Sequence, residues 1–183
     1  MPLSLLKTRG FFKHQGVDVQ GIARAFLKNL SAGKVEQGGS TITQQVTKSL
    51  ILKNVKKTYR RKVREAILSV QLEKSFSKEH ILFLYLNQIY LGQGAYGVEA
   101  ASQTYFHKPA KDLNLSEASL LAGLPQAPAR YSPVTHFDRA KARQKYVLTR
   151  MYEEGFITEA SRDQALQATL QIYGKEINTF ERA

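Results

Sequence analysis

The chain has 183 residues, of which 43% are hydrophobic and 23% charged, a balance typical of one globular domain and not of a disordered chain. Its net charge of +12 indicates an anionic partner: a nucleic acid, an anionic membrane surface or a phosphorylated substrate. The absence of cysteine excludes disulfide and thiol chemistry. No stretch approaches the roughly 18 apolar residues of a transmembrane helix, and residues 1–12 lack the pattern of a signal peptide. We therefore expect a chain without an anchor or signal of its own.

The first predicted helix follows an irregular lead that covers residues 1–16. Asp18 is suited to be its N-cap, and Ser31 to Gly33 would end it. The apolar residues between these signals recur at helical spacing; they are Val19, Ile22, Ala23, Phe26, Leu27 and Leu30. This pattern predicts an amphipathic helix.

Residues 38–73 form the stretch around which the chain is organised, with two helical segments joined by a basic link. Thr41 and Gln44 fit a capping box, so the first segment is predicted to begin there. The glycine pair before it leaves the N–H groups of a helix N-terminus accessible, which suits an anion. Lys48 lies on the same helical face as Thr41 and Gln44.

The second segment of this stretch combines an apolar stripe with charged residues. The stripe predicts a core-facing helix and consists of Tyr59, Val63, Ala66, Ile67 and Val70. Beside it, Arg61, Lys62 and Glu65 lie about one turn apart. One carboxylate is therefore expected among several cations, next to the predicted anion site.

Simpler structural explanations exist for each of these features. A Gly-Gly-Ser-Thr sequence before a helix is usually only a loop and a cap. Arg61 or Lys62 with Glu65 could form a solvated pair that contributes a few tenths of a kcal/mol. The wider basic run could be an exposed face; it comprises Lys56, Lys57, Arg60, Arg61, Lys62 and Arg64.

The remainder of the chain also predicts helices and turns. Ser77 would cap a third helix, and the run Ile81–Leu91 is apolar on nearly every side. Such a helix is either central to the core or in contact with lipid, and a place in the centre of the core is the prediction. A glycine-rich turn follows at residues 93–97, and helical spacing resumes over Val98–Phe106.

Four further signals complete the C-terminal half. Ser116 would begin a short helix that Gly123 and Pro125 end, and the prolines of residues 126–133 predict an extended loop. Phe137–Glu154 reads as a long amphipathic helix closed by Gly155, and Thr158 would cap a last helix. No strand pattern is present, so the predicted fold class is mostly α.

Taken together, these segments resemble the peptidoglycan glycosyltransferases, the transglycosylase domains of class A penicillin-binding proteins and their monofunctional relatives. The resemblance runs from about Arg9 to Ala165. Its motifs, in order, are FFKHQGVD, GGSTITQQVTK, RRKVREA, YLNQIYLGQGAYGVEAA, LSEASLLAGLPQAPARYSP and VLTRMYEEGFIT. We therefore expect a glycosyltransferase domain over residues 9–173, preceded by a non-family lead at 1–8 and followed by a tail at 174–183.

The resemblance implies a lysozyme-like, bilobed helical domain with a small jaw lobe. Members of the family polymerise lipid II into glycan strands with inversion and release undecaprenyl pyrophosphate at the outer face of the bacterial cytoplasmic membrane. The implied partners are lipid II, the growing glycan strand, an anionic membrane surface and moenomycin-type inhibitors, with no nucleic acid. No firmly bound cofactor is implied; a divalent cation, Mg²⁺ or Mn²⁺, is a candidate companion of the pyrophosphate.

The family's functional residues can be placed on this sequence one by one. Glu65 matches the second functional glutamate, beside the leaving group. Lys48, Arg61 and Lys62 would hold pyrophosphate, and the remaining residues that the resemblance assigns to substrate binding are Phe11, His14, Ser40, Thr41 and Gln44.

The first family motif is incomplete. Counted back from Phe11, the Glu-Asp pair that opens it falls on Lys7 and Thr8. This Glu is the family's general base, whereas a lysine ammonium has no lone pair to accept a proton. We therefore expect a nearly inactive chain, with Met1 to Thr8 foreign to the domain through a truncated or mis-started frame. A true pseudoenzyme is the alternative. Smaller departures are Ser49 for the usual Asn and Phe83 for a common Glu.

Three other functions remain as alternatives. A non-catalytic module that binds lipid II or membrane is favoured by Lys7 and Thr8, while retention of Glu65 weighs against it. A lysozyme-type glycan hydrolase needs two carboxylates across a sugar, and a convincing second one is missing. Only the charge suggests a nucleic-acid binder, because no recognition motif accompanies it.

Overall fold

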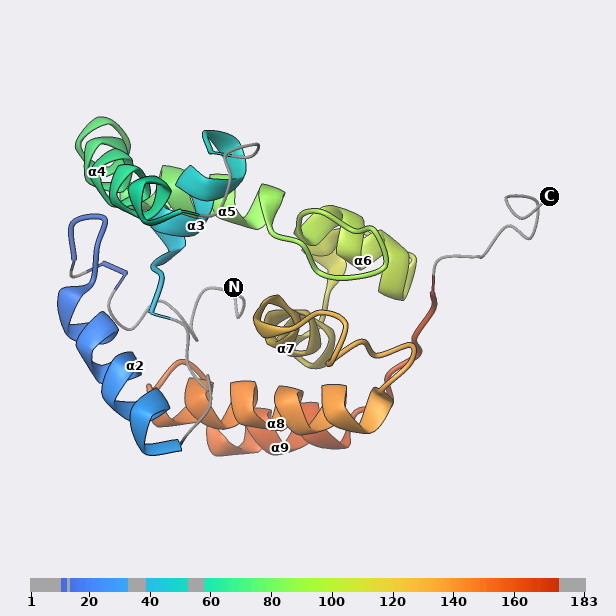
Figure 1. The fold of residues 1–183 in the computed structure, drawn as a ribbon. Coiled ribbons are helices and arrows are strands. Elements are labelled where there is room, and N and C mark those ends of the chain that lie inside the picture. Colours follow the sequence, from blue (N-terminus) through green and yellow to red (C-terminus); the bar gives the residue numbers. More distant parts are fainter. Residues whose placement is uncertain (1–10, 13, 33–38, 53–57, 175–183) are drawn as a thin grey trace. The chain divides into compact units, whose positions relative to one another are not determined.

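The computed structural model describes residues 11–12, 14–32, 39–52 and 58–174, which form two compact units divided between Gln88 and Ile89. Both units are helical (Figure 1). Within these residues, the only strand-like pairing is an isolated antiparallel bridge between Tyr90 and Tyr96. The predicted mostly α, lysozyme-like fold class is confirmed. Lys7 and Thr8, the rest of the predicted lead, and the tail beyond Gly174 lie outside the described residues.

The first unit contains α2 (Val19–Ala32), α3 (Ile42–Leu50), α4 (Tyr59–Ser75) and α5 (Lys78–Gln88), and α3 packs against both α4 and α5. Their starts agree with the predicted caps. The Asp18 carboxylate accepts a hydrogen bond from the N–H of Gly21, and Thr41 with Gln44 forms a complete capping box. The hydroxyl of Ser77 accepts from the N–H of His80. Local side-chain chemistry therefore sets where these helices begin.

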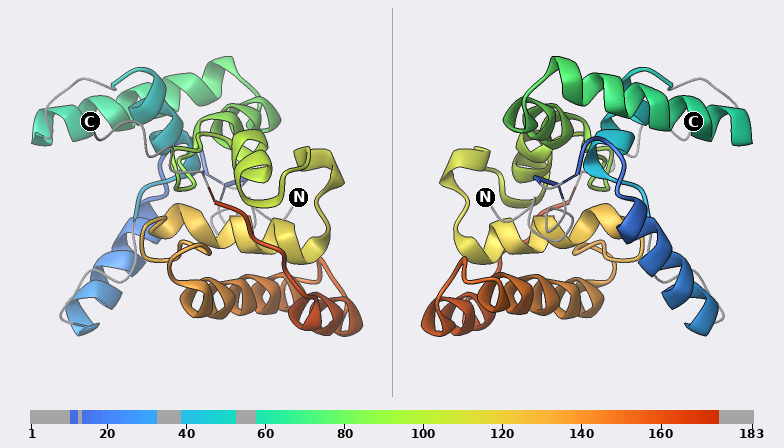
Figure 2. Two further views of the ribbon diagram at one scale, coloured as in Figure 1. Left: turned by 90° about the vertical axis from the view of Figure 1, so that its right-hand side faces the viewer. Right: turned by 90° about the vertical axis from the view of Figure 1, so that its left-hand side faces the viewer.

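The second unit contains α6 (Val98–Phe106), α7 (Leu115–Gly123), α8 (Phe137–Glu153) and α9 (Glu159–Gln167), with short 3-10 turns η2 (Ala110–Asp112) and η3 (Leu124–Gln126). Helix α8 packs against both α7 and α9, and Figure 2 shows α8 and α9 next to each other below α7. Thr158 caps α9 as predicted. Helix α7 begins at Leu115 and not at Ser116, because Asn114 and Glu117 form a second capping box that the sequence reading missed.

Helix α4 does not turn its apolar stripe to the core, so this prediction is wrong. Tyr59 is 94% exposed, and Val63 and Ile67 are also exposed. Glu65 and Ser69 are buried instead. The reason is that the neighbouring helix offers polar partners: the hydroxyls of Ser69 and Thr47 lie 3.1 Å apart between α4 and α3. Helix α4 is amphipathic as predicted, but the face with Glu65 and Ser69 is the one that packs against α3.

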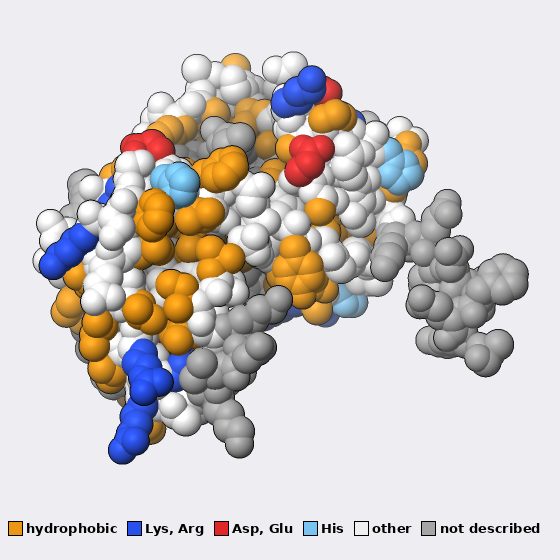
Figure 3. All heavy atoms as spheres, turned by 90° about the horizontal axis from the view of Figure 1, so that it is seen from above, with side chains coloured by type: hydrophobic (Ala, Val, Ile, Leu, Met, Phe, Trp, Pro, Cys, Tyr) orange, Lys and Arg blue, Asp and Glu red, His pale blue; other side chains and the backbone are white. Residues whose placement is uncertain are grey.

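Helix α5 is only partly buried, which also corrects the prediction of a central core helix. Ile81 and Tyr85 are buried, whereas Phe83 is 62% exposed, and the helix ends at Gln88. Val19 and Leu30 of α2 are exposed as well. Apolar side chains therefore gather on the surface over α4 and α5 (Figure 3). Among the helices of the described ranges, none is long and apolar enough to span a bilayer.

Candidate active site

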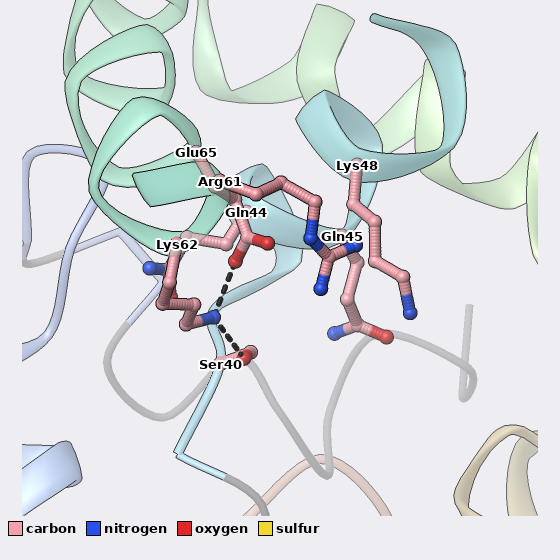
Figure 4. A pocket seen from close by; sticks show the side chains of 7 residues that line it. All are labelled: Ser40, Gln44, Gln45, Lys48, Arg61, Lys62 and Glu65. Carbon is pink, nitrogen blue, oxygen red and sulfur yellow. Dashed lines mark hydrogen bonds and ion pairs between the residues drawn. The ribbon is translucent and has the colours of Figure 1, made fainter. Parts of the chain in front are cut away.

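A pocket of about 300 Å³ opens between α3 and α4 of the first unit (Figure 4). Helix α3 and the turn before it supply four of its side chains, and the first two turns of α4 supply three. The lining residues are Ser40, Gln44, Gln45, Lys48, Arg61, Lys62 and Glu65. Six of the nine predicted site residues therefore line one cavity: Glu65, Ser40, Gln44, Lys48, Arg61 and Lys62.

Among the described residues that line the pocket, Glu65 is the one carboxylate, and it is 2% exposed. It forms an ion pair with Lys62, which lies one turn earlier on α4. The Lys62 ammonium also donates to the hydroxyl of Ser40 over 3.0 Å, so it bridges α4 and the segment before α3. A buried carboxylate without such a partner would be strongly disfavoured. Lys62 therefore keeps Glu65 in place at the edge of the pocket.

Two further cations point into the same open space from opposite walls. Lys48 extends from α3 and Arg61 from α4, as Figure 4 shows. Across the residues that the structure describes, neither side chain forms an ion pair, and the buried Nε of Arg61 has no hydrogen-bond partner. Unpaired cations that face each other across a cavity attract an anionic group. The geometry thus favours a phosphate or carboxylate between them.

Thr41 and Gln44 have mainly structural roles. The Thr41 hydroxyl accepts from the N–H of Gln44 over 3.1 Å and donates to the carbonyl of Gly16 over 2.7 Å. The Gln44 side chain in turn accepts from the N–H of Thr41 over 2.9 Å. Thr41 is buried and is absent from the pocket lining. Two N–H groups that the sequence reading offered to an anion are therefore already occupied, and cations dominate the site instead.

Gln45 is a lining residue that the sequence reading missed. Its amide nitrogen donates to the carbonyl of Thr41 over 3.2 Å, and its side chain points toward the pocket beside Lys48. No local pattern in the sequence sets Gln45 apart from the other polar side chains of α3, so only the packed structure places it in the lining.

Phe11 and His14 lie away from the pocket lining. Phe11 is fully buried, and its ring meets that of His14 edge to face, with centroids 6.1 Å apart. Burial, followed by the nearby Lys78 ammonium, lowers the pKa of His14, while Glu73 and Asp18 oppose this shift. The structure therefore brings these two predicted substrate-binding residues together with each other, but not with the cations.

The donor set of the pocket does not suit a divalent cation. Hard cations require several oxygen ligands, most often carboxylates. Glu65 is already paired with Lys62, and its other neighbours in the lining are cations or neutral side chains. No group of three or more His, Asp or Glu residues suited to a metal occurs in the described ranges.

The fold and the pocket define an α-helical domain that places three cations and one buried carboxylate around an anion-sized cavity. The sequence profile described as Transglycosylase matches residues 6–152. The chain belongs to the transglycosylase family.

Its relatives include penicillin-binding protein 1A of Neisseria flavescens, which is 54% identical over 160 residues, covering 87% of this chain and 20% of the relative. The protein of the same name from Aquifex aeolicus is 51% identical over 164 residues, covering 90% and 22%. A crystal structure of penicillin-binding protein 1A from Haemophilus influenzae matches 55% of this chain and 15% of its own, with 42% identity and a TM-score of 0.52. The chain thus spans about a fifth of the length of the curated relatives it matches.

Proposed function

We propose that this domain is a peptidoglycan glycosyltransferase and that its pocket holds the pyrophosphate of a lipid-linked glycan. The observation that carries the proposal is the pair of cations, Lys48 and Arg61, that face one cavity without an acidic partner in the described part of the chain. Family membership supports the reaction type, and the names of the relatives support a role in cell-wall synthesis.

The chemistry of the pocket suits a departing pyrophosphate. In lipid II polymerisation, the acceptor's 4-hydroxyl forms a bond to C1 of the growing strand's terminal sugar. The bond from C1 to the pyrophosphate oxygen breaks with inversion, and negative charge develops on that oxygen. Fixed cations aimed at this charge stabilise the transition state more than the ground state. Lys48 and Arg61 would supply this stabilisation, with Lys62 and Glu65 beside the leaving group.

The proton of the attacking hydroxyl needs a separate acceptor. The family's general base falls on Lys7, which lies outside the described residues and, as an ammonium, cannot accept a proton. Leaving-group stabilisation and proton removal are therefore expected to be separable in this chain. We propose that substrate binding is retained and that turnover is low.

A non-catalytic protein that binds lipid II is the second candidate function. It is favoured by Lys7 and Thr8, which replace the Glu-Asp pair, and it uses the same cationic pocket. A lysozyme-type hydrolase is disfavoured, because the described lining of the pocket offers one carboxylate, Glu65, where two are needed.

Incubation of the chain with labelled lipid II in detergent tests these functions against one another. We expect lipid II to bind, with little polymer formed. Abundant polymer would identify an active enzyme and a base other than residue 7. Soluble cleaved glycan would identify a hydrolase. Failure to bind lipid II at any accessible concentration would contradict the proposal as a whole.

The membrane surface is the partner proposed for the exposed side of α4. Tyr59, Val63 and Ile67 form an exposed apolar stripe along this helix, and Arg60 and Arg64 lie exposed among them. Apolar side chains interspersed with basic ones are typical of a helix that lies in a lipid interface. Such contact would place the pocket near a lipid-linked substrate at the outer face of the cytoplasmic membrane.

We expect the chain to co-sediment with anionic vesicles and to be released by salt. Each basic residue near an anionic surface contributes about 1 kcal/mol, and molar salt screens this attraction within about 3 Å. Replacing Arg60 and Arg64 by Gln should therefore weaken binding by roughly tenfold or more.

The matched control replaces Arg139 and Lys145 by Gln, which removes the same charge from exposed positions on α8. Val63→Gln with Ile67→Gln tests the apolar part at unchanged charge. Binding to neutral vesicles as strong as to anionic ones would contradict a membrane-facing α4. So would an equal loss of vesicle binding in the α4 variant and in the α8 control.

A further inference from the structure

A second cluster of charged groups lies outside the pocket, where the segment of residues 11–16 meets α3, α4 and α5. Its centre is an ion pair between Glu73, near the end of α4, and Lys78, at the start of α5, with 2.7 Å between Nζ and Oε2. The side chains are 5% and 20% exposed, respectively. Removing one partner of a pair this well shielded leaves a buried charge without compensation, which costs far more than the loss of a surface pair. Neither residue is among the residues that line the pocket.

Lys78 reaches three partners at once. Besides Glu73, its ammonium donates to the backbone carbonyl of His14 over 2.6 Å. It also lies over the ring of Phe11, 4.5 Å from the centroid. An ammonium has three donors and attracts an aromatic face, so one side chain can satisfy all of these contacts. Lys78 thereby fastens both ends of the Phe11–His14 turn to α4 and α5.

Glu73 extends the connection to α3. Its second carboxylate oxygen accepts a hydrogen bond from the hydroxyl of Thr43, which is fully buried on α3. His14 Nδ1 lies 3.9 Å from the same oxygen, too far for a hydrogen bond. The turn, α3, α4 and α5 therefore all meet at one carboxylate and one ammonium.

The far end of the segment is fixed independently. Gly16 has φ +86°, and a side chain there would come within 2.7 Å of the Ser69 backbone on α4. Its carbonyl accepts from the Thr41 hydroxyl over 2.7 Å. The segment is thus held at Phe11 and His14 by the ion pair and at Gly16 by close backbone packing.

We infer that Glu73 and Lys78 are positioning residues that hold Phe11 and His14, in the described part of the family's first motif, against α3, α4 and α5 for glycosyl transfer. This inference rests on the proposed function. The pocket cations bind the leaving group from α3 and α4, while the first motif acts on the acceptor hydroxyl. The ion pair is the contact that joins the described part of this motif to all three helices.

The test uses Lys78→Met, which keeps the packing over Phe11 and removes the ammonium, and Glu73→Gln, which removes the negative charge and keeps a hydrogen-bonding head. Lys78→Arg is the conservative control, because it retains the charge and several donors. In Lys78→Met we expect the ¹⁵N order parameters of Gln15 and Gly16 to fall from about 0.85 toward 0.6, with α3 unchanged. Lys78→Arg should restore most of the order.

The titration of His14 gives a readout that a general loss of stability would not produce. The charged groups that face His14 are Lys78, Glu73 and Asp18. Removing the Lys78 cation should raise the pKa of His14, and removing the Glu73 anion should lower it. If NMR shows that the His14 pKa shifts in opposite directions in the two variants, both Lys78 and Glu73 act on His14 as the cluster requires. Shifts of the His14 pKa in the same direction would contradict the inference.

The kcat for lipid II shows whether Lys78 positions the first motif for catalysis or only contributes to stability. In the background Lys7→Glu with Thr8→Asp, we expect Lys78→Met to lower kcat for lipid II by about tenfold or more, as for a mispositioned catalytic group. Its affinity for moenomycin should stay within about twofold, because the pocket cations are untouched.

If the order parameters of Gln15 and Gly16 fall in Lys78→Met but kcat is unchanged, the inference is wrong. It is also wrong if these order parameters do not change. Failure of the proposed function would be seen separately, as an absence of lipid II binding by the parent chain, while the order parameters and the His14 titration need no substrate.

Discussion

Replacing Lys7 by Glu and Thr8 by Asp is expected to raise the rate of lipid II polymerisation by about 10²–10⁴-fold. This range is what a positioned general base contributes to proton removal, on the order of 3–5 kcal/mol of barrier. A sugar hydroxyl keeps its proton far above neutral pH, and a lysine ammonium at the base position has no lone pair with which to accept it. The double substitution rebuilds the Glu-Asp pair and leaves every described residue of the pocket unchanged.

Single-turnover polymerisation in detergent measures this gain. The matched control is Lys74→Glu with Ser75→Asp, which makes a comparable change at exposed positions near the end of α4. It should leave the rate at the parent level. Adding Glu65→Gln to the rebuilt motif should lower the rate again. Robust polymerisation by the parent chain would show that Lys7 does not occupy the base position.

Removal of either pocket cation is expected to weaken binding of moenomycin or lipid II by roughly ten- to a hundredfold. A hydrogen bond to a charged group contributes about 1.5–3 kcal/mol, and about 1.4 kcal/mol corresponds to a tenfold change in affinity. Lys48→Ala and Arg61→Ala each remove one such contact from opposite walls of the pocket. Titration calorimetry in detergent gives the affinities.

Arg139→Ala and Lys145→Ala are the controls, since both residues are exposed on α8. They should leave the affinity within about twofold, as is usual for distant surface charges. The affinity of the parent should fall with added salt, and each pocket variant should show a weaker salt dependence. Equal losses in control and pocket variants would mean that net charge, and not the pocket, binds the lipid phosphates.

Sequence reasoning located the helices well, because their starts depend on local chemistry. Asp18, Thr41 with Gln44 and Thr158 each cap a helix as predicted, through contacts that span only three residues. The spacing of Arg61, Lys62 and Glu65 also placed one carboxylate correctly among cations. Both correct predictions, the helix caps and the carboxylate among cations, depend on spacings that a single helix determines.

The errors arose where the answer depends on a neighbouring element. Periodicity identified the two faces of α4, but only the hydroxyl of Thr47 and the close approach of Gly16 explain why its Ser69 face is buried. Tertiary partners also decided that Gln45, and not Thr41, faces the pocket. The anchoring of Phe11 by Lys78 joins residues 67 positions apart, a separation at which no local pattern is informative.

Lys48 and Arg61 have no ion-pair partner among the described residues, and this determines what kind of compound can compete for the cavity. A neutral ligand would have to displace the hydration of two cations without replacing it, which costs affinity. An inhibitor therefore needs its own anion, or a rigid fork of acceptors matched to the planar guanidinium. Because Lys62 already serves the buried Glu65, such an acceptor pair should span the space between α3 and α4 and leave that ion pair intact.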